Sequence, residues 1–261
     1  MNIIETHNLN YKSLNKVLFN NINLEIEEGS FTSIIGQNEC GKSTLLKILS
    51  GSIISSNYVK INNILVNKFN IEEIMKITSH IKNKNEFFSK TVLDEILLDK
   101  KETTVFDVNL VKKMLNDFGL LNISNISPLK LSYAENQIVA LIKAIFKKPK
   151  IIFLDNAFSK LDQEKRSELL KFVKDYSKKN NITVIYTTNY ISDLYYSDRI
   201  IFIKDRGIFF DGKYTELIDM DINKEGLKLP FEVEVSNKLM MYDLIDKVHF
   251  SLDDLVGDLC R

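Results

Sequence analysis

The strongest constraint on the fold of this chain is a nine-residue stretch, GQNECGKST, at residues 36–44. Before it, residues 31–35 are apolar and partly β-branched, as in a buried strand. After it, residues 45–49 place leucine and isoleucine at helical spacing. A strand, a glycine-rich loop and a helix in this order are the context that a phosphate-binding loop requires. The stretch therefore predicts an anion site between this strand and helix, since a coincidental glycine-rich turn is not expected to carry both flanking patterns.

Each prominent residue of this loop has a physical role in holding phosphate. Gly36 and Gly41 let the backbone curl, so that successive N–H groups and the positive end of the following helix point at one spot. Lys42 would reach the outer phosphates of a nucleoside triphosphate, and Ser43 would offer its hydroxyl to Mg²⁺. Glu39 brings a negative charge into the loop, which would weaken affinity for an anion. The other candidate nucleotide-binding residues of the loop are Gln37, Asn38, Cys40 and Thr44.

A second candidate ligand for the metal ends another apolar run, IIFLD, at residues 151–155. A carboxylate at the C-terminal edge of a strand, beside a phosphate loop, is where an acid that organises Mg²⁺ must lie. We therefore expect Asp155 and Ser43 to share the metal.

The composition limits the remaining possibilities. In the 261 residues, Lys plus Arg and Asp plus Glu number 35 each, so no net charge points to a nucleic acid or an acidic membrane. The two cysteines, Cys40 and Cys260, have no metal-ligand spacing and favour a reducing compartment. We interpret Cys40, although it is near a helix N-terminus, as a tolerated variable position. No run approaches the ~18 apolar residues of a membrane span, and the start lacks a signal-peptide layout, so membrane association is expected to be peripheral.

The first part of the chain mixes strand-like and helix-like runs. Residues 3–35 are typical of short strands broken by turns, and residues 58–66 alternate like an edge strand. KNKN, at residues 82–85, is expected to be a loop. Residues 91–146 are mostly helical in period.

The second part predicts β-α alternation. Compact runs at residues 151–154 and 182–187 are typical of buried parallel strands, and a helix-like stretch at residues 163–179 separates them. Residues 199–212 predict a hairpin with its turn at residues 205–207. The length suits one large α/β domain with a short appendage.

Three segments together resemble one protein family. LSYAENQIVALIKAIFKKPKIIFLD, at residues 131–155, resembles the stretch from signature helix to magnesium strand in ATP-binding cassette (ABC) ATPases. SKLD, at residues 159–162, resembles their D-loop, and residues 183–217 are similar to their switch strand and final hairpin. The resemblance implies a P-loop NTPase fold of the ABC type, which has a mixed central sheet, an N-terminal antiparallel β subdomain and a helical subdomain. It also implies ATP and Mg²⁺ as cofactors.

The resemblance assigns further site residues. The signature, which faces the site of a partner subunit, corresponds to Leu131, Ser132, Tyr133, Ala134 and Glu135, and the D-loop includes Ser159, Leu161 and Asp162. Tyr11 falls where an aromatic residue commonly stacks on adenine. An ordinary strand aromatic is an equal alternative for Tyr11, because aromatic residues favour strands whatever the ligand.

The C-terminal part narrows the resemblance. Residues 225–260 and the segment EFFSKTVLDEI, at residues 86–96, resemble energy-coupling factor transporter ATPases. In that family two ATPase subunits lie under a membrane protein that grips them through coupling helices, while a separate membrane protein captures a micronutrient. The implied organisation is a nucleotide-binding domain at residues 1–218, with a helical subdomain at about residues 88–140, and a C-terminal extension at residues 219–261 that supports pairing. A simple packed cap on the first domain is the alternative for the extension.

Several positions depart from the family. Asn156 stands where active members carry the glutamate that acts as general base, and an amide cannot accept that proton. Thr188 is assigned to the switch-histidine position, and Lys82 to the glutamine position of the Q-loop. Tyr133 and Ala134 replace two signature glycines, and the tyrosine ring is expected to obstruct the approach to the partner's phosphate. These departures predict a heterodimer whose second ATPase carries most of the turnover.

The implied function is an ATP-binding subunit of a micronutrient importer, peripheral on the cytoplasmic face of the cell membrane. A nucleotide-gated scaffold or regulatory subunit that hydrolyses nothing is the alternative, which the departures at Asn156, Thr188 and Tyr133 favour. An ABC ATPase acting on nucleic acid is disfavoured, because the chain has neither a long coiled-coil insertion nor a basic face.

Overall fold

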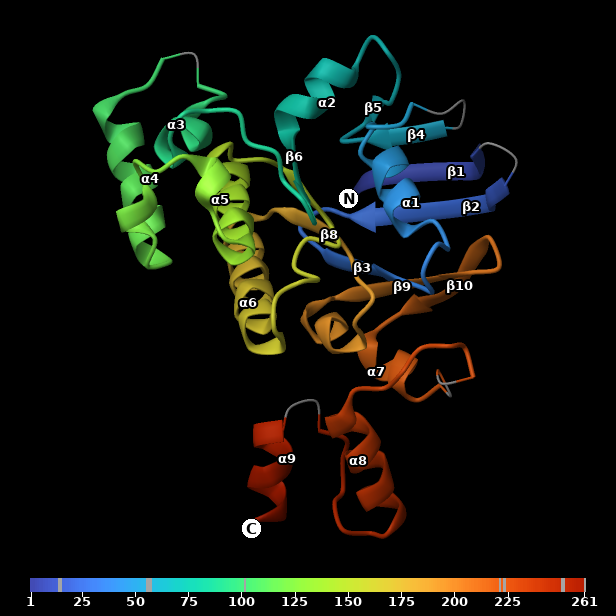
Figure 1. The fold of residues 1–261 in the computed structure, drawn as a ribbon. Coiled ribbons are helices and arrows are strands. Elements are labelled where there is room, and N and C mark those ends of the chain that lie inside the picture. Colours follow the sequence, from blue (N-terminus) through green and yellow to red (C-terminus); the bar gives the residue numbers. More distant parts are fainter. Residues whose placement is uncertain are drawn as a thin grey trace.

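The computed structural model describes residues 1–13, 16–54, 58–100, 102–220, 222, 224–249 and 252–260. Figure 1 shows a body with two sheets, a group of helices to one side of it, and two helices that protrude below it and carry the C-terminal end. None of the helices in the described ranges has both the length and the apolar run that crossing a bilayer requires.

The central sheet has the strand order β10-β9-β3-β8-β7-β6. Its members are β3 (Phe31–Ile35), β6 (Thr78–Lys82), β7 (Ile151–Asp155), β8 (Thr183–Thr187), β9 (Arg199–Lys204) and β10 (Gly207–Gly212). Neighbours run parallel except β10, which is antiparallel to β9. The sheet is therefore mixed, as predicted from the sequence.

The register of the parallel strands brings their carboxyl ends to one edge. Lys82 lies opposite Asp155, Asp155 lies opposite Thr187, and Thr187 lies opposite Ile34. The glycine-rich loop starts directly after β3, so it leaves the sheet at the edge where Asp155 and Thr187 also end. This is the edge at which open α/β sheets bind ligands.

Helices cover both faces of the central sheet, which explains why its strands are almost continuously apolar. On β7, Ile151 and Phe153 pack into a cluster with α1 (Lys42–Leu49). The alternate residues, Ile152 and Leu154, pack into a second cluster with α5 (Tyr133–Phe146) and α6 (Gln163–Asn180).

The N-terminal sheet is antiparallel, in the order β2-β1-β4-β5. The sequence analysis was wrong about its strands, because β1 (Asn2–Ser13) and β2 (Lys16–Glu27) are long rather than short and broken by turns. Register shifts interrupt their alternation, and Asn8 and Asn21 take positive φ within the pair. The expected single edge strand at residues 58–66 is a hairpin of β4 (Tyr58–Ile61) and β5 (Ile64–Leu65), because Asn62 and Asn63 both take positive φ and form its turn.

Strand β6 was not predicted from the sequence. It follows α2 (Ile71–Ile77) directly and forms the edge of the central sheet beside β7. Its sequence, TSHIK, is polar, yet Thr78, Ser79 and Ile81 are buried. An edge strand of this composition lacks the apolar run on which the prediction depended.

The helical region consists of α3 (Val92–Leu97), α4 (Val105–Asp117), two short 3₁₀ turns at Leu121–Ile123 and Pro128–Lys130, and α5. Thr91, Thr104 and Ser132 cap the three α-helices, each through a side-chain oxygen that accepts from a backbone N–H. In Figure 1 these helices lie on the side of the central sheet away from the N-terminal sheet.

The C-terminal part begins after α7 (Tyr214–Ile218) and contains α8 (Phe231–Met241) and α9 (Leu252–Leu259), with residues 250 and 251 outside the described ranges. Leu227 and Val233 are buried in a cluster with Ile35 and Phe202 of the central sheet, so the start of α8 is anchored to the body. His249 joins the two helices, since its Nε2 lies 2.8 Å from the Asp258 carboxylate.

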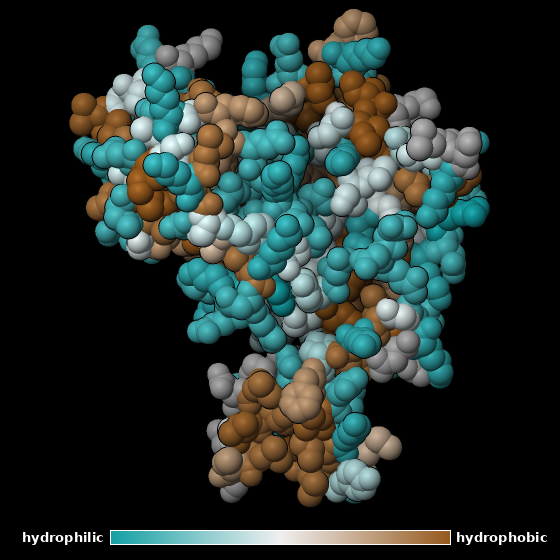
Figure 2. All heavy atoms as spheres, viewed as in Figure 1, coloured by the Kyte–Doolittle hydropathy of each residue, from teal (hydrophilic) through white to brown (hydrophobic). Residues whose placement is uncertain are grey.

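The far part of this extension leaves large apolar side chains in solvent. Figure 2 shows them as a brown face over the lower unit. Met241 is 82% exposed and Tyr242 is 77% exposed, and the surface also includes Phe231, Leu244, Leu252, Val256 and Leu259. Contiguous apolar surface of this kind is typical of an interaction site. The extension therefore packs against the body at the start of α8, as a packed cap would, and exposes apolar side chains at its far end.

A buried polar network joins α6 to the end of β8. Arg166 donates to the Asp193 carboxylate at 2.7 Å and to the Leu161 carbonyl at 3.1 Å. The hydroxyls of Tyr186 and Thr188 each donate to the other Asp193 oxygen at 2.7 Å. Burial, together with the Asp193 charge, raises the pKa of Tyr186 well above its usual value, so this phenol stays a donor.

We expect Arg166→Ala to lower the free energy of unfolding by about 3–5 kcal/mol, because it leaves the Asp193 charge buried without its cation. Chemical denaturation measures the change. The matched control is Lys165→Ala on the same helix, since Lys165 forms an exposed pair with Glu168 that is worth at most about 1 kcal/mol. Equal stability losses in the two variants would contradict this account of the network.

Candidate functional site

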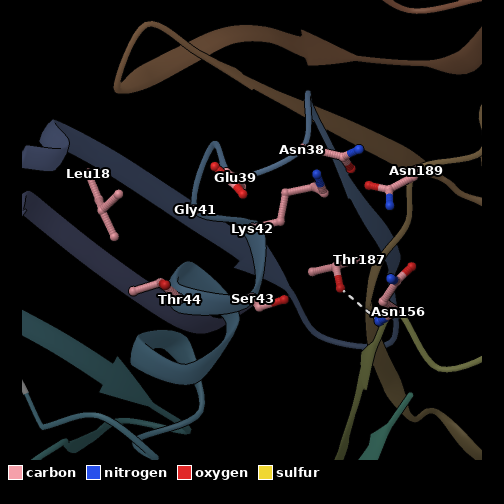
Figure 3. Close-up of a pocket in the computed structure, with 10 residues that line it drawn as sticks. All are labelled: Leu18, Asn38, Glu39, Gly41, Lys42, Ser43, Thr44, Asn156, Thr187 and Asn189. Atoms are coloured by element: carbon pink, nitrogen blue, oxygen red, sulfur yellow. Dashed lines mark hydrogen bonds between the residues drawn. The ribbon is translucent and has the colours of Figure 1, made fainter. Parts of the chain in front are cut away.

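A cavity of about 300 Å³ lies at the carboxyl edge of the central sheet. Figure 3 shows its walls: the glycine-rich loop and the start of α1 on one side, and the ends of β7 and β8 on the other. Its lining consists of Leu18, Asn38, Glu39, Gly41, Lys42, Ser43, Thr44, Asn156, Thr187 and Asn189. The sequence analysis missed Leu18, Thr187 and Asn189.

Two glycines permit the loop conformation. Gly41 has a φ of +105°, which side chains rarely adopt, and a Cβ there would lie 2.8 Å from the Phe19 ring. A Cβ on Gly36 would lie 2.5 Å from the Ile203 carbonyl oxygen. The loop therefore fits closely between β2, β9 and α1, and its backbone rather than its side chains shapes the cavity.

Lys42 is folded over this loop. Its Nζ donates to the Gly36 and Gln37 carbonyls, both at 2.8 Å. Burial lowers the pKa of Lys42, while the neighbouring Cys40 and Asp155 oppose that shift. The ammonium group is thus held inside the loop, where an anion in the cavity would meet it.

Ser43, Asp155 and Thr187 form a chain of hydrogen bonds across the base of the cavity. The Ser43 hydroxyl donates to Asp155 Oδ1 at 2.6 Å, and the Thr187 hydroxyl donates to the same oxygen at 3.0 Å. In the described parts of the chain, no group of three or more His, Cys, Asp or Glu side chains could hold a metal by itself. One carboxylate and one hydroxyl beside a phosphate loop fit Mg²⁺, which usually takes few protein ligands and binds phosphate oxygens and water as well.

Asn156, which directly follows Asp155, also lines the cavity. Its backbone has a φ of +49°, and its N–H donates to the Thr187 carbonyl at 3.1 Å and to the Thr187 hydroxyl at 2.9 Å. The side-chain oxygen Oδ1 is buried and has no hydrogen-bond partner in the described structure. An unpaired buried acceptor costs about 1–3 kcal/mol, so a donor in the cavity, such as a water molecule, would satisfy it.

Thr188, which the sequence analysis assigned to the switch position, does not line the cavity. Thr188 is fully buried and donates to Asp193, so it faces away from the cavity. Asn189 lines the cavity instead. The strand places alternate residues on opposite faces, and therefore a shift of one residue reverses the direction of the side chain.

Tyr11 does not line the cavity. Its ring packs against the core cluster of the N-terminal sheet, with its centroid 6.4 Å from that of Phe19. This position matches the alternative that Tyr11 is an ordinary strand aromatic. Leu18, from β2, borders the cavity near the loop, and nothing in the sequence pattern distinguished it from other strand residues.

Lys82 ends β6 opposite Asp155 but lines a second and larger cavity of about 710 Å³. This cavity lies between α2, β6 and the helical region, and its walls include Lys84, Phe88 and Lys147. The His80 ring stacks on Phe153 there, with centroids 4.9 Å apart.

The signature residues occupy the start of α5. Ser132 caps the helix, and Glu135 Oε2 accepts from the Ser132 N–H at 2.8 Å in a reciprocal capping box. Leu131 and Ala134 are partly buried against the helical core. The Tyr133 side chain makes a contact within its own subunit, because its hydroxyl lies 2.7 Å from the Ala157 carbonyl oxygen. Obstruction of the partner's phosphate by Tyr133 stays a prediction.

The D-loop residues are held by their neighbours. The Tyr190 hydroxyl donates to the Ser159 carbonyl at 3.0 Å, and the Leu161 carbonyl accepts from Arg166. Asp162 caps α6 by accepting from the Lys165 N–H at 2.8 Å. Of the loop residues, Gln37 donates to the Glu225 carbonyl at 3.2 Å, and the Cys40 sulfur lies 4.0 Å from Lys42 Nζ.

Comparison with known proteins identifies relatives along the whole chain. The ABC transporter family profile matches residues 19–159. The energy-coupling factor transporter ATP-binding protein EcfA of Pediococcus pentosaceus is 31% identical over all of this chain and 98% of its own length. EcfA1 of Ligilactobacillus salivarius is 30% identical over all of this chain and 96% of its own length.

Solved structures support the same fold. The cbiO1 protein of Clostridium perfringens, described as part of the ABC transporter complex cbiONQ, superposes with a TM-score of 0.76 at 24% identity, covering 92% of this chain and 99% of its own. The ATP-binding cassette MJ0796, in a dimeric post-hydrolysis state bound to ADP and Pi, gives a TM-score of 0.70 at 24% identity over 81% of this chain and 98% of its own. The predicted P-loop fold of the ABC type is confirmed.

We expect Lys42→Ala to weaken binding of Mg-ATP by about 10- to 100-fold, because the charge-assisted bonds of the ammonium to phosphate are lost. Isothermal titration calorimetry measures the affinity. Lys47→Ala, an exposed lysine in the last turn of α1, is the matched control and should bind as the unchanged chain does. Unaltered binding by Lys42→Ala would show that the anion site lies elsewhere.

The environment of His80 predicts a pH effect. Desolvation of the ring, which stacks on Phe153 while part of the side chain stays open to solvent, and then the charges of Lys82 and Lys147 lower the pKa of His80 from 6.5 to about 4, and Asp155 opposes the shift. Because the unfolded chain takes up this proton more readily, the free energy of unfolding should decrease as the pH falls from about 6.5 to about 4. NMR titration of the ring should give this low pKa, and Lys82→Gln should raise it. A pKa near 6.5 would contradict the prediction.

Proposed function

Because the chain belongs to the ABC transporter family, among its energy-coupling factor transporter ATP-binding proteins, we propose that it is the ATP-binding subunit of a micronutrient importer. The observation that carries this proposal is that Lys42 and Ser43 line one cavity and that Ser43 donates a hydrogen bond to Asp155 behind it, in a chain that aligns along its full length with such subunits. ATP binding would close two subunits against each other and so move the membrane partner.

Different groups at the cavity would bind different parts of Mg-ATP. The backbone amides of the loop and Lys42 hold the phosphates. Ser43 and Asp155 would hold Mg²⁺, which would neutralise phosphate charge. Leu18 provides an apolar wall beside the loop. Glu39 faces the cavity with a negative charge, which opposes these attractions.

Hydrolysis at this site is proposed to be slow. We assign Asn156 to the position of the family's carboxylate base and, because Asn189 rather than Thr188 lines the cavity, we propose Asn189 for the position of the switch histidine. Both amides can orient a water molecule by hydrogen bonds, but neither can take its proton at neutral pH. General-base assistance is typically worth about 10²- to 10⁴-fold in rate. The proposed site would therefore still bind ATP but hydrolyse it slowly.

We propose a heterodimer with a second ABC ATPase. In such a pair each site combines the phosphate loop of one subunit with the signature of the other, so this chain would present the altered LSYAE signature to its partner's loop. The apolar surface of α8 and α9 supports the extension as part of the pairing surface. The partner would carry most of the turnover.

The membrane partners would be a transmembrane coupling protein and a substrate-capture protein. The second cavity supports this arrangement, because it is large, open to solvent and bordered by Phe88 and Met75, which are 81% and 60% exposed. An amphipathic coupling helix fits such a groove. The chain would then lie peripherally on the cytoplasmic face of the membrane.

A scaffold or regulatory subunit that binds ATP without hydrolysis is the second candidate function. Asn156 favours it, because the side chain offers no base at the position nearest the attacking water. Binding alone can close a clamp to the extent that the closed state binds nucleotide more tightly than the open state.

Single-turnover hydrolysis separates the two functions. The purified chain should hydrolyse ATP slowly, and Asn156→Glu should increase the rate by about 10²- to 10⁴-fold by restoring a base. Asn156→Gln is the matched control and should give no increase. Absence of recovery in Asn156→Glu would favour the scaffold, whereas an unchanged chain as fast as ordinary ABC ATPases would contradict slow hydrolysis.

Purification from membranes tests the assembly. A second ATPase and a multi-span protein should accompany the chain in equal amounts. A chain recovered alone, or with nucleic acid, would contradict the importer.

A further inference from the structure

Tyr133 begins helix α5, directly after the capping residue Ser132. The ring folds back along its own chain and is partly buried against the core cluster that contains α5 and α6. A glycine at this position, as in the family signature, could make none of the contacts that follow.

The phenol occupies the turn that follows strand β7. Its hydroxyl lies 2.7 Å from the Ala157 carbonyl oxygen and 3.1 Å from the side-chain oxygen of Asn83. Burial raises the pKa of Tyr133, while the Lys160 backbone and the Ser159 side chain, which hydrogen-bond to the phenol, oppose that shift. The Lys160 ammonium lies 5.8 Å from the ring centroid. The phenol is therefore enclosed by the turn at residues 157–160.

The same hydroxyl also connects to the segment after strand β6. The Asn83 N–H donates to the Asp155 carbonyl at 3.0 Å, and the Gln137 side chain donates to the Asn83 carbonyl at 3.0 Å. Tyr133 thus joins three segments, namely the start of α5, the end of β6 and the turn after β7. Two of these segments meet at Asp155, the proposed metal ligand.

The turn held by Tyr133 carries a wall of the cavity. Ala157 directly follows Asn156, whose side chain lines the cavity opposite the glycine-rich loop (Figure 3). A nucleoside triphosphate in the loop extends further towards this wall than a diphosphate does, because the loop amides hold the inner phosphates and the outermost phosphate lies beyond them. The position of Asn156 therefore affects a triphosphate more than a diphosphate.

From this geometry, and given the proposed nucleotide-binding function, we infer that Tyr133 is a positioning residue. Its phenol fixes the turn that carries Asn156, and so increases the preference of the cavity for a nucleoside triphosphate over a diphosphate. The hydrogen bond to Ala157 holds the backbone next to Asn156, and the contact with Asn83 ties that backbone to the segment after β6. Tyr133 thus connects segments within its own subunit.

Calorimetry on the full chain tests the inference with two probes, Mg-ADP and the non-hydrolysable analogue Mg-AMPPNP. Tyr133→Phe removes only the hydroxyl. It should weaken AMPPNP binding by about 3- to 10-fold, the value of one hydrogen bond, while ADP affinity stays within about twofold. Asn83→Ala, which removes the other partner of the phenol, should shift the ratio of the two affinities in the same direction.

The matched control is Tyr176→Phe, on α6, whose ring stacks on Phe172 and does not line the cavity. It should leave both affinities unchanged. Equal weakening for the two nucleotides in Tyr133→Phe would indicate a merely structural role and overturn the inference, as would an unchanged ratio. If the unaltered chain bound neither nucleotide, the proposed function itself would be contradicted. If it bound both and Tyr133→Phe left the ratio of the two affinities unchanged, only the inference about Tyr133 would be contradicted.

Discussion

The site depends on one constraint, the level at which the parallel strands of the central sheet end. Register places Thr187 opposite Asp155, and β3 ends beside β8 where the glycine-rich loop begins. Only at that common edge can the Ser43 and Thr187 hydroxyls both reach Asp155 Oδ1. A slip of one residue in β7 or β8 would turn these side chains to the opposite face of the sheet. The apolar clusters on both faces fix the register, and so the core determines the geometry of the site.

The same edge underlies our proposal that the chain binds nucleotide and hydrolyses it slowly. The groups proposed to bind phosphate and metal are the loop backbone, Lys42, Ser43 and Asp155, of which Asp155 connects to the cavity through its hydrogen bond with Ser43. Where we propose that water would be activated, the cavity presents two amides, Asn156 and Asn189. Amides retain hydrogen bonding without basicity, so the changes preserve the shape and polarity of the pocket while removing proton transfer. We therefore regard tight binding and slow turnover as two results of one set of substitutions.

Features with a local chemical signature could be predicted from the sequence. The loop and the strand that ends in Asp155 followed from short motifs and apolar periods, and the mixed sheet followed from the resemblance to ABC ATPases. Features that depend on side-chain direction or long-range packing could not be predicted in this way. After β8, Asn189 lines the cavity and Thr188 does not, because successive side chains of an extended chain point to opposite sides. Strand β6 was missed because an edge strand with polar residues carries no apolar run. The contact of Tyr133 with the turn at residues 157–160 could not be predicted either, because it joins residues that are far apart in the sequence.

The apolar end of the C-terminal extension has a consequence for the cell. A subunit that exposes Met241, Tyr242 and Leu244 to water is safe only while another surface covers them. If pairing provides that cover, copies made in excess of their partner would aggregate or be degraded. The amount of this protein that persists would then depend on how much partner is made with it. Degradation of unpaired copies would leave mainly assembled ones.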